Sequence, residues 1–427
     1  MNKPLPPVAY TIPPLIKRNT TLFSLSQCFT GAGMQLAYGI GPLMVMAVTG
    51  EAGLAGITVA LMGLSRFLVS YPIGKVTDAF GRKPGILMGL VLALGGTVTV
   101  GLSMQLLSFG MLVFGMLVFG MGMNAANQMR VAATDMFPPR LRAQALGYVA
   151  LGSLAGLVIC PVMISGAEMV APSLGQYPLG LPWFLLPVLI LGGMVLVVFV
   201  RPDPKEIGQN LREYYPNYVP PPAPAPGSVS PKFGTMTLMR FAPTRLGIVC
   251  NAAAQGNMSI VMVLTSLVLS HHGYSLSAIA FSHTFHSLGM FGFTIPLGKL
   301  ADRFGRERVM YPGVAASIVG ALLVSIPADI VSVTIGTYLV GIGWAAANVA
   351  ATALIADKVE TAERGRAIGV AESFAGASSV MSALITGPLI AWLSLPAAGV
   401  LAVLLAAVPL LMRAFTSKAS LEAVERV

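Results

Sequence analysis

The sequence predicts an all-α membrane protein of twelve transmembrane helices in two pseudo-symmetric six-helix bundles. Three observations support this prediction. The 427 residues are 55% hydrophobic and only 10% charged, with a mean hydropathy of +0.79, whereas soluble domains are about 25% charged. The apolar residues fall into runs long enough to cross a bilayer, which takes about 20 residues. One loop motif also occurs twice, about half the chain length apart.

The composition argues against several other classes of protein. Three cysteines are too few for a disulfide scaffold, and the apolar content excludes a disordered chain. The net charge of +10 does not indicate a nucleic-acid partner, because the basic residues form short clusters between apolar runs. No phosphate loop, zinc-helix motif or nucleophile elbow is recognisable. We therefore expect a protein that is not an enzyme and holds no permanent cofactor.

The apolar runs define twelve expected helices, because backbone groups in hydrocarbon must be satisfied within their own segment. Their approximate bounds are 21–48, 52–73, 84–104, 110–134, 144–166, 182–200, 245–269, 276–297, 309–328, 331–356, 367–391 and 397–412.

These spans divide the chain into five parts. The expected parts are a cytoplasmic N-terminal segment (1–20), an N-terminal bundle (21–200), a cytoplasmic proline-rich linker (201–243), a C-terminal bundle (244–412) and a cytoplasmic tail (413–427). The first segment lacks the short apolar core and cleavage site of a removable signal peptide.

The distribution of basic residues predicts the orientation in the membrane. The loops near 49–51, 105–109, 167–181, 270–275, 329–330 and 392–396 contain no lysine or arginine, whereas the loops on the other side are basic. Because cytoplasmic loops carry the excess of basic residues, both termini are expected in the cytoplasm. Only Arg66 and Arg130 lie well inside a span. We interpret Arg130 as a residue that snorkels or pairs with a loop.

The repeated motif relates the two halves of the chain. Residues 74–82 read GKVTDAFGR and residues 298–306 read GKLADRFGR, with six of nine positions identical. Asp135 and Asp357 occupy corresponding places after spans four and ten. An acidic side chain just past a helix end can accept backbone N–H groups from a neighbouring helix start, and glycines permit tight turns. We predict a conformational latch formed by Gly74, Asp78, Gly81, Arg82, Gly298, Asp302, Gly305 and Arg306; a role in topology or folding alone is the alternative.

The doubled G-K-x-x-D-x-F-G-R motif resembles the loop signature of the major facilitator superfamily. The resemblance covers essentially the whole chain. It implies secondary transport by two six-helix bundles around a central cavity that opens alternately to either side. In this fold helices two and eleven meet across the bundle interface. The resemblance therefore implies that Arg66 and Glu372 pair to close the cytoplasmic side. Two independent water-facing residues are the alternative, and Glu372 would serve proton coupling equally well.

Methionine and histidine residues suggest what is transported. The chain has 24 methionines, most of which we interpret as packing. Met258 and Met262 in span seven, and His286 and Met290 in span eight, are each spaced i,i+4, so each pair lies on one helical face. Both pairs lie near the membrane midplane. Thioether and imidazole groups together suit copper, and thioethers select Cu(I). Ordinary packing pairs are the alternative.

The same Met-x-x-x-Met and His-x-x-x-Met pattern resembles the bacterial CcoA-type copper importers, which supply cytochrome cbb3 oxidase assembly. The resemblance implies copper as the transported ion, the bacterial inner membrane as the location, and a copper chaperone as a partner beside the lipid bilayer. Some related transporters import riboflavin, so riboflavin or another small organic solute is the alternative substrate. A proton-coupled drug exporter is a weaker alternative, because span five lacks the glycine-proline pattern of those antiporters.

Further residues are auxiliary candidates for handling metal. Cys28 and Cys250 occupy equivalent positions in the two halves, His283 lies one turn before His286, and His271 and His272 lie at the external end of span seven. Met34 and Met62 precede Met258 and His286 by 224 residues, the spacing between the two copies of the loop motif. The alternative for the cysteines is ordinary packing. The alternative for His271 and His272 is that they are hydrated loop residues.

Overall fold

The computed structural model describes residues 11–218, 235–326, 329–359 and 363–415, and the regular structure of these residues is entirely helical. The N-terminal bundle contains α1 (Pro14–Thr49), α2 (Ile57–Phe80), α3 (Arg82–Gln105), α4 (Phe109–Ala126), α5 (Gln128–Asp135), α6 (Arg142–Val170) and α7 (Leu181–Val198). The C-terminal bundle contains α11 (Ala242–His271), α12 (Leu276–Gly292), α13 (Thr294–Phe304), α14 (Arg306–Ser325), α15 (Ile330–Asp357), α16 (Arg364–Trp392) and α17 (Leu395–Phe415).

The predicted fold class is confirmed, with two helices interrupted. In the described residues, eleven helices are long and apolar enough to cross a membrane. The remaining expected span, the eighth, is divided at Phe293 into the 17 residues of α12 and the 11 residues of α13. The fourth span is divided in the same way at Asn127, between α4 and α5. The sequence carries a signal for both interruptions. Pro296, in the first turn of α13, cannot donate a backbone hydrogen bond to the Gly292 carbonyl at the end of α12. The fourth span becomes polar where it is interrupted, at Asn124, Asn127 and Gln128.

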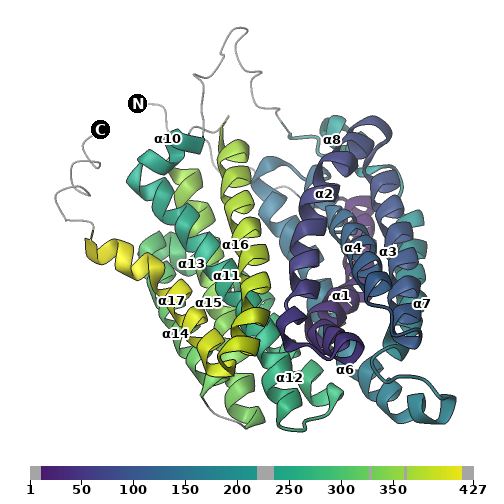
Figure 1. Ribbon diagram of the computed structural model, residues 1–427. Coiled ribbons are helices and arrows are strands. Elements are labelled where there is room, and N and C mark those ends of the chain that lie inside the picture. Colours follow the sequence, from purple (N-terminus) through teal and green to yellow (C-terminus); the bar gives the residue numbers. More distant parts are fainter. Residues whose placement is uncertain (1–10, 219–234, 327–328, 360–362, 416–427) are drawn as a thin grey trace.

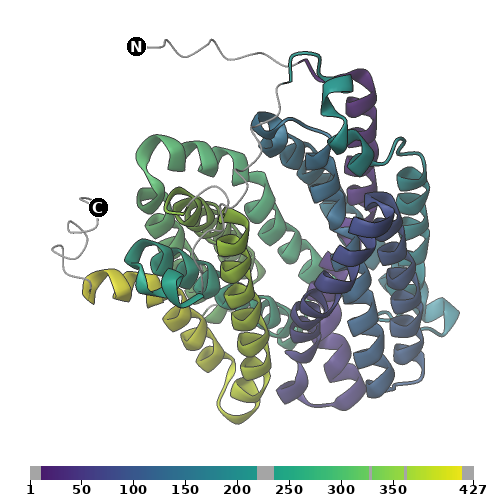
Figure 2. The same ribbon diagram turned by 90° about the horizontal axis from the view of Figure 1, so that it is seen from above.

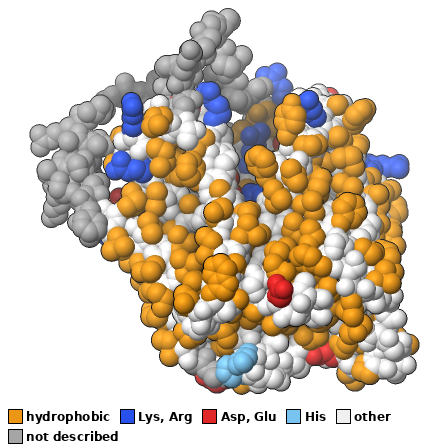
Figure 3. Space-filling model, viewed as in Figure 1, with side chains coloured by type: hydrophobic (Ala, Val, Ile, Leu, Met, Phe, Trp, Pro, Cys, Tyr) orange, Lys and Arg blue, Asp and Glu red, His pale blue; other side chains and the backbone are white. Residues whose placement is uncertain are grey.

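The two bundles lie side by side, and the described ends of the linker lie at one end of both (Figure 1). Seen from that end, the N-terminal and C-terminal helices form two separate groups (Figure 2). Basic side chains gather at the end where α8 (Pro204–Gln209) and α10 (Thr235–Arg240) lie, while acidic and histidine side chains show at the opposite end (Figure 3). This separation matches the charge asymmetry between the two sets of loops.

The first helix begins earlier than its apolar run indicates. Pro14 is its first residue, a position that proline favours because its missing N–H is not needed there. The polar residues that follow bond to the end of α7: the Arg18 guanidinium donates to the Phe199 carbonyl (3.2 Å), and the Asn19 amide donates to the Arg201 carbonyl (3.1 Å). Hydrogen bonds from polar residues therefore hold the start of α1, and a hydropathy profile cannot predict them.

The repeated loop motif makes equivalent contacts in the two halves. Arg82 Nε donates to Asp135 Oδ2 at 2.7 Å, and Arg306 Nε donates to Asp357 Oδ2 at 3.0 Å. Each arginine also pairs with the aspartate four residues before it: Asp78 lies 3.8 Å from Arg82, and Asp302 bonds Arg306. The internal repeat seen in the sequence is therefore also a repeat of side-chain contacts.

Two glycines make the turns of this motif possible. Gly81 (φ 102°) separates α2 from α3, and Gly305 (φ 99°) separates α13 from α14. With ψ near 150–170°, both have a backbone conformation that is essentially restricted to glycine. Gly74 and Gly298 instead lie inside α2 and α13, where no such requirement exists.

Among the described residues of the linker, Asp203 hydrogen-bonds to the first of the two loops. The Asp203 carboxylate accepts the backbone N–H groups of Arg82 (3.0 Å) and Lys83 (2.9 Å) at the start of α3. This is the contact that we expected a motif aspartate to make. Asp203, which precedes α8, makes it instead, while the Asp78 side chain is 80% exposed. Asp203 supplies both an acceptor and a negative charge where the helix dipole is positive.

These turns predict an order of stability for alanine substitutions. We expect Gly305→Ala to destabilise the protein by about 1–3 kcal/mol, because of backbone strain. Gly81→Ala should cost more, since a Cβ there would also lie 2.8 Å from the Asp203 carboxylate. Gly298→Ala is the matched control and should be neutral or slightly stabilising, because its Cβ would make only an ordinary contact, 3.7 Å from Val349. Thermal unfolding in detergent measures the order; equal stability of the three variants would contradict this account of the turns.

Candidate functional site

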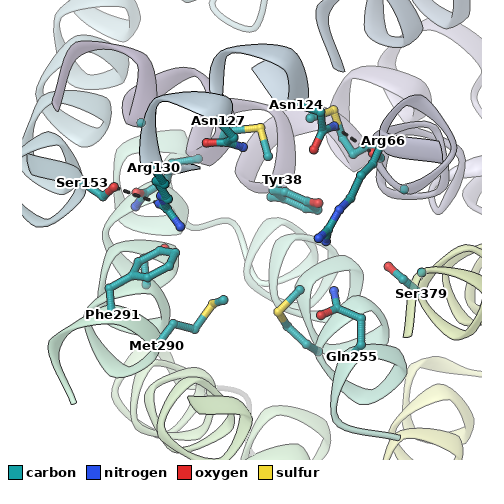
Figure 4. Close-up of a pocket in the computed structure, with 18 of the residues that line it drawn as sticks. Tyr38, Arg66, Asn124, Asn127, Arg130, Ser153, Gln255, Met290, Phe291 and Ser379 are labelled. Carbon is teal, nitrogen blue, oxygen red and sulfur yellow. Dashed lines mark hydrogen bonds between the residues drawn. The ribbon is translucent and has the colours of Figure 1, made fainter. Parts of the chain in front are cut away.

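A cavity of about 520 Å³ lies between the two bundles. This is the size of pockets that hold small molecules, roughly 300–1,000 Å³. Its walls come from α1, α2, α4, α5 and α6 on one side and from α11, α12, α15 and α16 on the other. Figure 4 shows side chains from both bundles projecting into it.

The cavity extends toward the linker end of the molecule and is closed at the opposite end. Toward the linker, its wall reaches Ile73 of α2 and Val131 of α5. At the other end the bundles are joined directly. The Glu168 carboxylate of α6 accepts the backbone N–H groups of Leu276 (2.6 Å) and Ser277 (3.0 Å) at the start of α12. Helices also touch backbone to backbone there: a Cβ added at Gly56 would lie 1.7 Å from the Ala383 carbonyl oxygen.

The four residues proposed to bind metal line this one cavity. Met258 and Met262 project from α11, and His286 and Met290 project from α12. Met258, Met262 and His286 are buried, with at most 6% of each residue exposed. The remaining sulfur and imidazole groups of the wall belong to Met34, Met62 and His283. Five methionines and two histidines therefore line the cavity.

One hydrogen bond determines which nitrogen of His286 is available. Its Nδ1 lies 2.9 Å from the carbonyl oxygen of Thr337 on α15. A carbonyl only accepts, so we assign the ring proton to Nδ1, which leaves a lone pair on Nε2. Nε2 is buried and has no hydrogen-bond partner in the part of the chain that the structure describes. Histidines that bind metals are typically oriented by such a bond from the other nitrogen.

His283 has the opposite arrangement. Its Nε2 lies 3.0 Å from the hydroxyl of Ser266 on α11, and its Nδ1 is buried without a partner. The same hydroxyl donates to the Gly39 carbonyl of α1 at 2.7 Å. An engaged hydroxyl proton leaves the serine oxygen to accept from Nε2. His283 therefore belongs to the contact between α1, α11 and α12 as well as to the cavity wall.

The other auxiliary candidates lie elsewhere. Cys250 is fully buried and packs with Met310 and Tyr311 in a separate cluster, and Cys28 is half-buried on α1; neither lines the cavity. His271 and His272 are exposed at the end of α11, with ring centroids 5.5 Å apart. Among the described residues no three His, Cys, Asp or Glu side chains gather as a metal site. A metal in the cavity would therefore depend on thioether ligands.

Arg66 and Glu372 meet across the bundle interface. The guanidinium of Arg66 on α2 lies 3.0 Å from the carboxylate of Glu372 on α16, and their side chains are 60% and 33% exposed. The amide of Asn251 also donates to Glu372 at 3.5 Å. The pair does not cap the cavity, because the wall continues past Arg66 to Ile73.

The polar part of the wall was not anticipated. Carboxamides line it at Gln27, Gln35, Asn124, Asn127, Gln128 and Gln255, and aromatic rings at Tyr38, Phe291 and Trp344. Arg130 belongs to this wall and points into the cavity (Figure 4). Our interpretation of Arg130 as a snorkelling or loop-pairing residue is therefore wrong. The sequence did contain a signal for its place in the cavity, because an ionisable residue inside a membrane span by default indicates a functional site.

Comparison with known proteins agrees with this architecture. The family model of the Major Facilitator Superfamily matches residues 23–241 and 246–425. The chain is 27% identical to the MFS-type transporter YdeG of Bacillus subtilis, over 88% of this chain and 86% of that one. It is 25% identical to the riboflavin transporter RfnT of Brucella anthropi, over 95% of this chain and 98% of that one.

Solved structures share the fold at low sequence identity. The nucleoside transporter NupG matches with a TM-score of 0.70 and 11% identity, covering 94% of this chain and all of that one. The D-xylose-proton symporter matches with a TM-score of 0.69 and 14% identity, covering 92% and 97% of the two chains. With two helical bundles, a cavity between them and a family model that matches both halves, the chain belongs to the Major Facilitator Superfamily of transporters.

Proposed function

We propose that the protein imports copper across the bacterial cytoplasmic membrane, with Met258, Met262, His286 and Met290 as the ligands of Cu(I). The observation that carries this proposal is the unpartnered Nε2 of His286, which is buried in a cavity wall that also carries five methionines. Thioethers are soft ligands that select Cu(I), and imidazole also suits copper. No lining residue in the described chain is a carboxylate, the charged donor that protein sites for Ca²⁺ and Mg²⁺ commonly use.

In the proposed cycle, the bundles rock about the central cavity. The linker and both termini face the cytoplasm, so the cavity described here is open inward and releases copper toward a cytoplasmic chaperone. The latch loops at Arg82 and Arg306 would bias the equilibrium between the inward and outward states. The Arg66–Glu372 pair would join α2 to α16 while the cavity is open to the cytoplasm.

A small organic solute such as riboflavin is the second candidate. Two observations favour it: the similarity to RfnT along almost the whole chain, and a cavity of about 520 Å³ lined by six carboxamides and three aromatic rings. Such a wall could stack on a ring system and hydrogen-bond to its polar groups. Assaying both substrates on the same variants separates the two candidates.

The sulfur atoms provide the direct test of the copper proposal. Met262→Leu with Met290→Leu keeps the apolar volume and removes two thioethers, so copper uptake per molecule of protein should fall at least tenfold. The matched control is Met116→Leu with Met123→Leu, because these methionines are buried in the N-terminal bundle away from the cavity. Radioactive copper uptake in cells is measured. Normal uptake by the first double variant refutes the copper site, and riboflavin uptake by the parent would then favour the second candidate.

The interbundle ion pair is tested by exchanging its charges. Arg66→Glu and Glu372→Arg should each reduce transport, because each replaces a contacting pair of opposite charges with two like charges close together. The double variant restores opposite charges and should recover part of the lost activity, giving a positive coupling in the double-mutant cycle. Transport by the double variant no better than that of the worse single variant would show that the pair has no role in the cycle.

A further inference from the structure

Arg130 is a partly buried cation, and no carboxylate among the described residues balances its charge. It lies on α5, where one Nη donates to the Ser153 hydroxyl at 3.1 Å and the guanidinium lies over the Phe291 ring of α12, 5.4 Å from its centroid. Its Nε is buried and has no hydrogen-bond partner among the described residues. Among the described residues no carboxylate forms an ion pair with it, although ion pairs are found for Arg66, Arg82 and Arg306.

These contacts do not compensate for the burial of the charge. A guanidinium has five N–H donors, and only one of them reaches a protein acceptor here. Burying a charge is costly unless it is both paired and hydrogen-bonded. The cation–π contact with Phe291 offsets only part of that cost. The unused donors and the unbalanced charge together suit an anion.

The rest of the cavity wall supplies no negative charge either. Arg66 and Arg130 are the only ionised side chains among its described lining residues, and only Arg66 is paired, with Glu372. The wall facing Arg130 includes Met290 and Phe291 of α12 (Figure 4). A bare Cu(I) ion at the thioethers would therefore share the cavity with an unpaired guanidinium, which repels it.

We infer that Arg130 is the anion-binding subsite of the cavity, and that the cargo carries a negatively charged group to it. The copper version of this inference rests on the proposed function. In that version, copper enters as Cu(I) together with an anionic ligand. The metal reaches the methionines and His286, and the anionic group pairs with Arg130. The metal stays Cu(I) throughout, so only coordination and hydrogen bonds are exchanged. An organic solute with an anionic group would use the same subsite without the metal.

The subsite is tested first without copper. Purified full-length protein is dialysed against ³⁵S-thiosulfate, an anion that is also a ligand of Cu(I). The parent should bind it, and Arg130→Gln should weaken binding at least tenfold. Arg142→Gln is the matched control, because Arg142 is exposed at the start of α6 and does not line the cavity; its binding should equal that of the parent. Equal binding by the parent and Arg130→Gln, or no binding by the parent, overturns the inference.

A conservative variant keeps the test decisive if Arg130→Gln does not fold. Arg130→Lys retains the charge but lacks the planar fork of donors, so it should bind thiosulfate at least threefold more weakly than the parent. Binding by Arg130→Lys equal to that of the parent would show that a positive charge anywhere near the position is sufficient, and would overturn the role given to the guanidinium.

A second measurement separates the anion subsite from the copper proposal. Proteoliposomes are given ⁶⁴Cu(I) either as its anionic ³⁵S-thiosulfate complex or as its cationic complex with acetonitrile, an uncharged ligand. The inference predicts faster uptake of the anionic complex by the parent and loss of that preference in Arg130→Gln. Equal uptake of both complexes by both proteins overturns the inference and leaves copper import standing. Thiosulfate binding through Arg130 without uptake of either complex refutes copper import and assigns the subsite to an organic anion.

Discussion

The candidate site depends on one hydrogen bond between two helices, from His286 Nδ1 to the Thr337 carbonyl. That carbonyl is within reach because α12 and α15 approach closely through glycines. A Cβ added at Gly341 would lie 2.2 Å from the His286 carbonyl oxygen, and one at Gly289 would lie 2.6 Å from the Tyr338 carbonyl oxygen. Small residues at membrane helix contacts permit such approach. By allowing the close approach of α12 and α15, Gly289 and Gly341 bring the Thr337 carbonyl within reach of His286 Nδ1, and this bond determines the tautomer of the histidine.

The same helix connects the site to the closed end of the cavity. The first turn of α12 is held by the Glu168 carboxylate of the other bundle, and its last two turns carry His286 and Met290. A carboxylate at a helix N-terminus is favoured by both the free N–H groups and the dipole. Opening the outer end would break this contact and move α12 relative to the N-terminal bundle. Access and ligand geometry are therefore coupled through one rigid element.

The sequence predicted those features that have a periodic or repeated signal. Hydropathy predicted the fold class, the doubled motif predicted the paired loops, and i,i+4 spacing predicted which methionines share a face. Features that depend on a single long-range contact were not predictable. The cap that Asp203 forms on α3 is one example, because the linker sequence shows only a polar, proline-rich segment. Arg130 is recognisable in the sequence as a cation inside a span, but its contacts with Ser153 of α6 and Phe291 of α12 exist only in the assembled fold. Cys28 and Cys250 show the converse: equivalent positions in the repeat do not place them at the cavity.

The central claim is that Cu(I) is bound by thioether sulfur and the free imidazole nitrogen of His286. X-ray absorption at the copper edge of the purified protein, loaded with one equivalent of Cu(I), tests it most directly. The account predicts a first coordination shell dominated by sulfur, with one nitrogen that disappears in His286→Ala. A shell of nitrogen and oxygen alone, or copper that is removed by gel filtration, would contradict it.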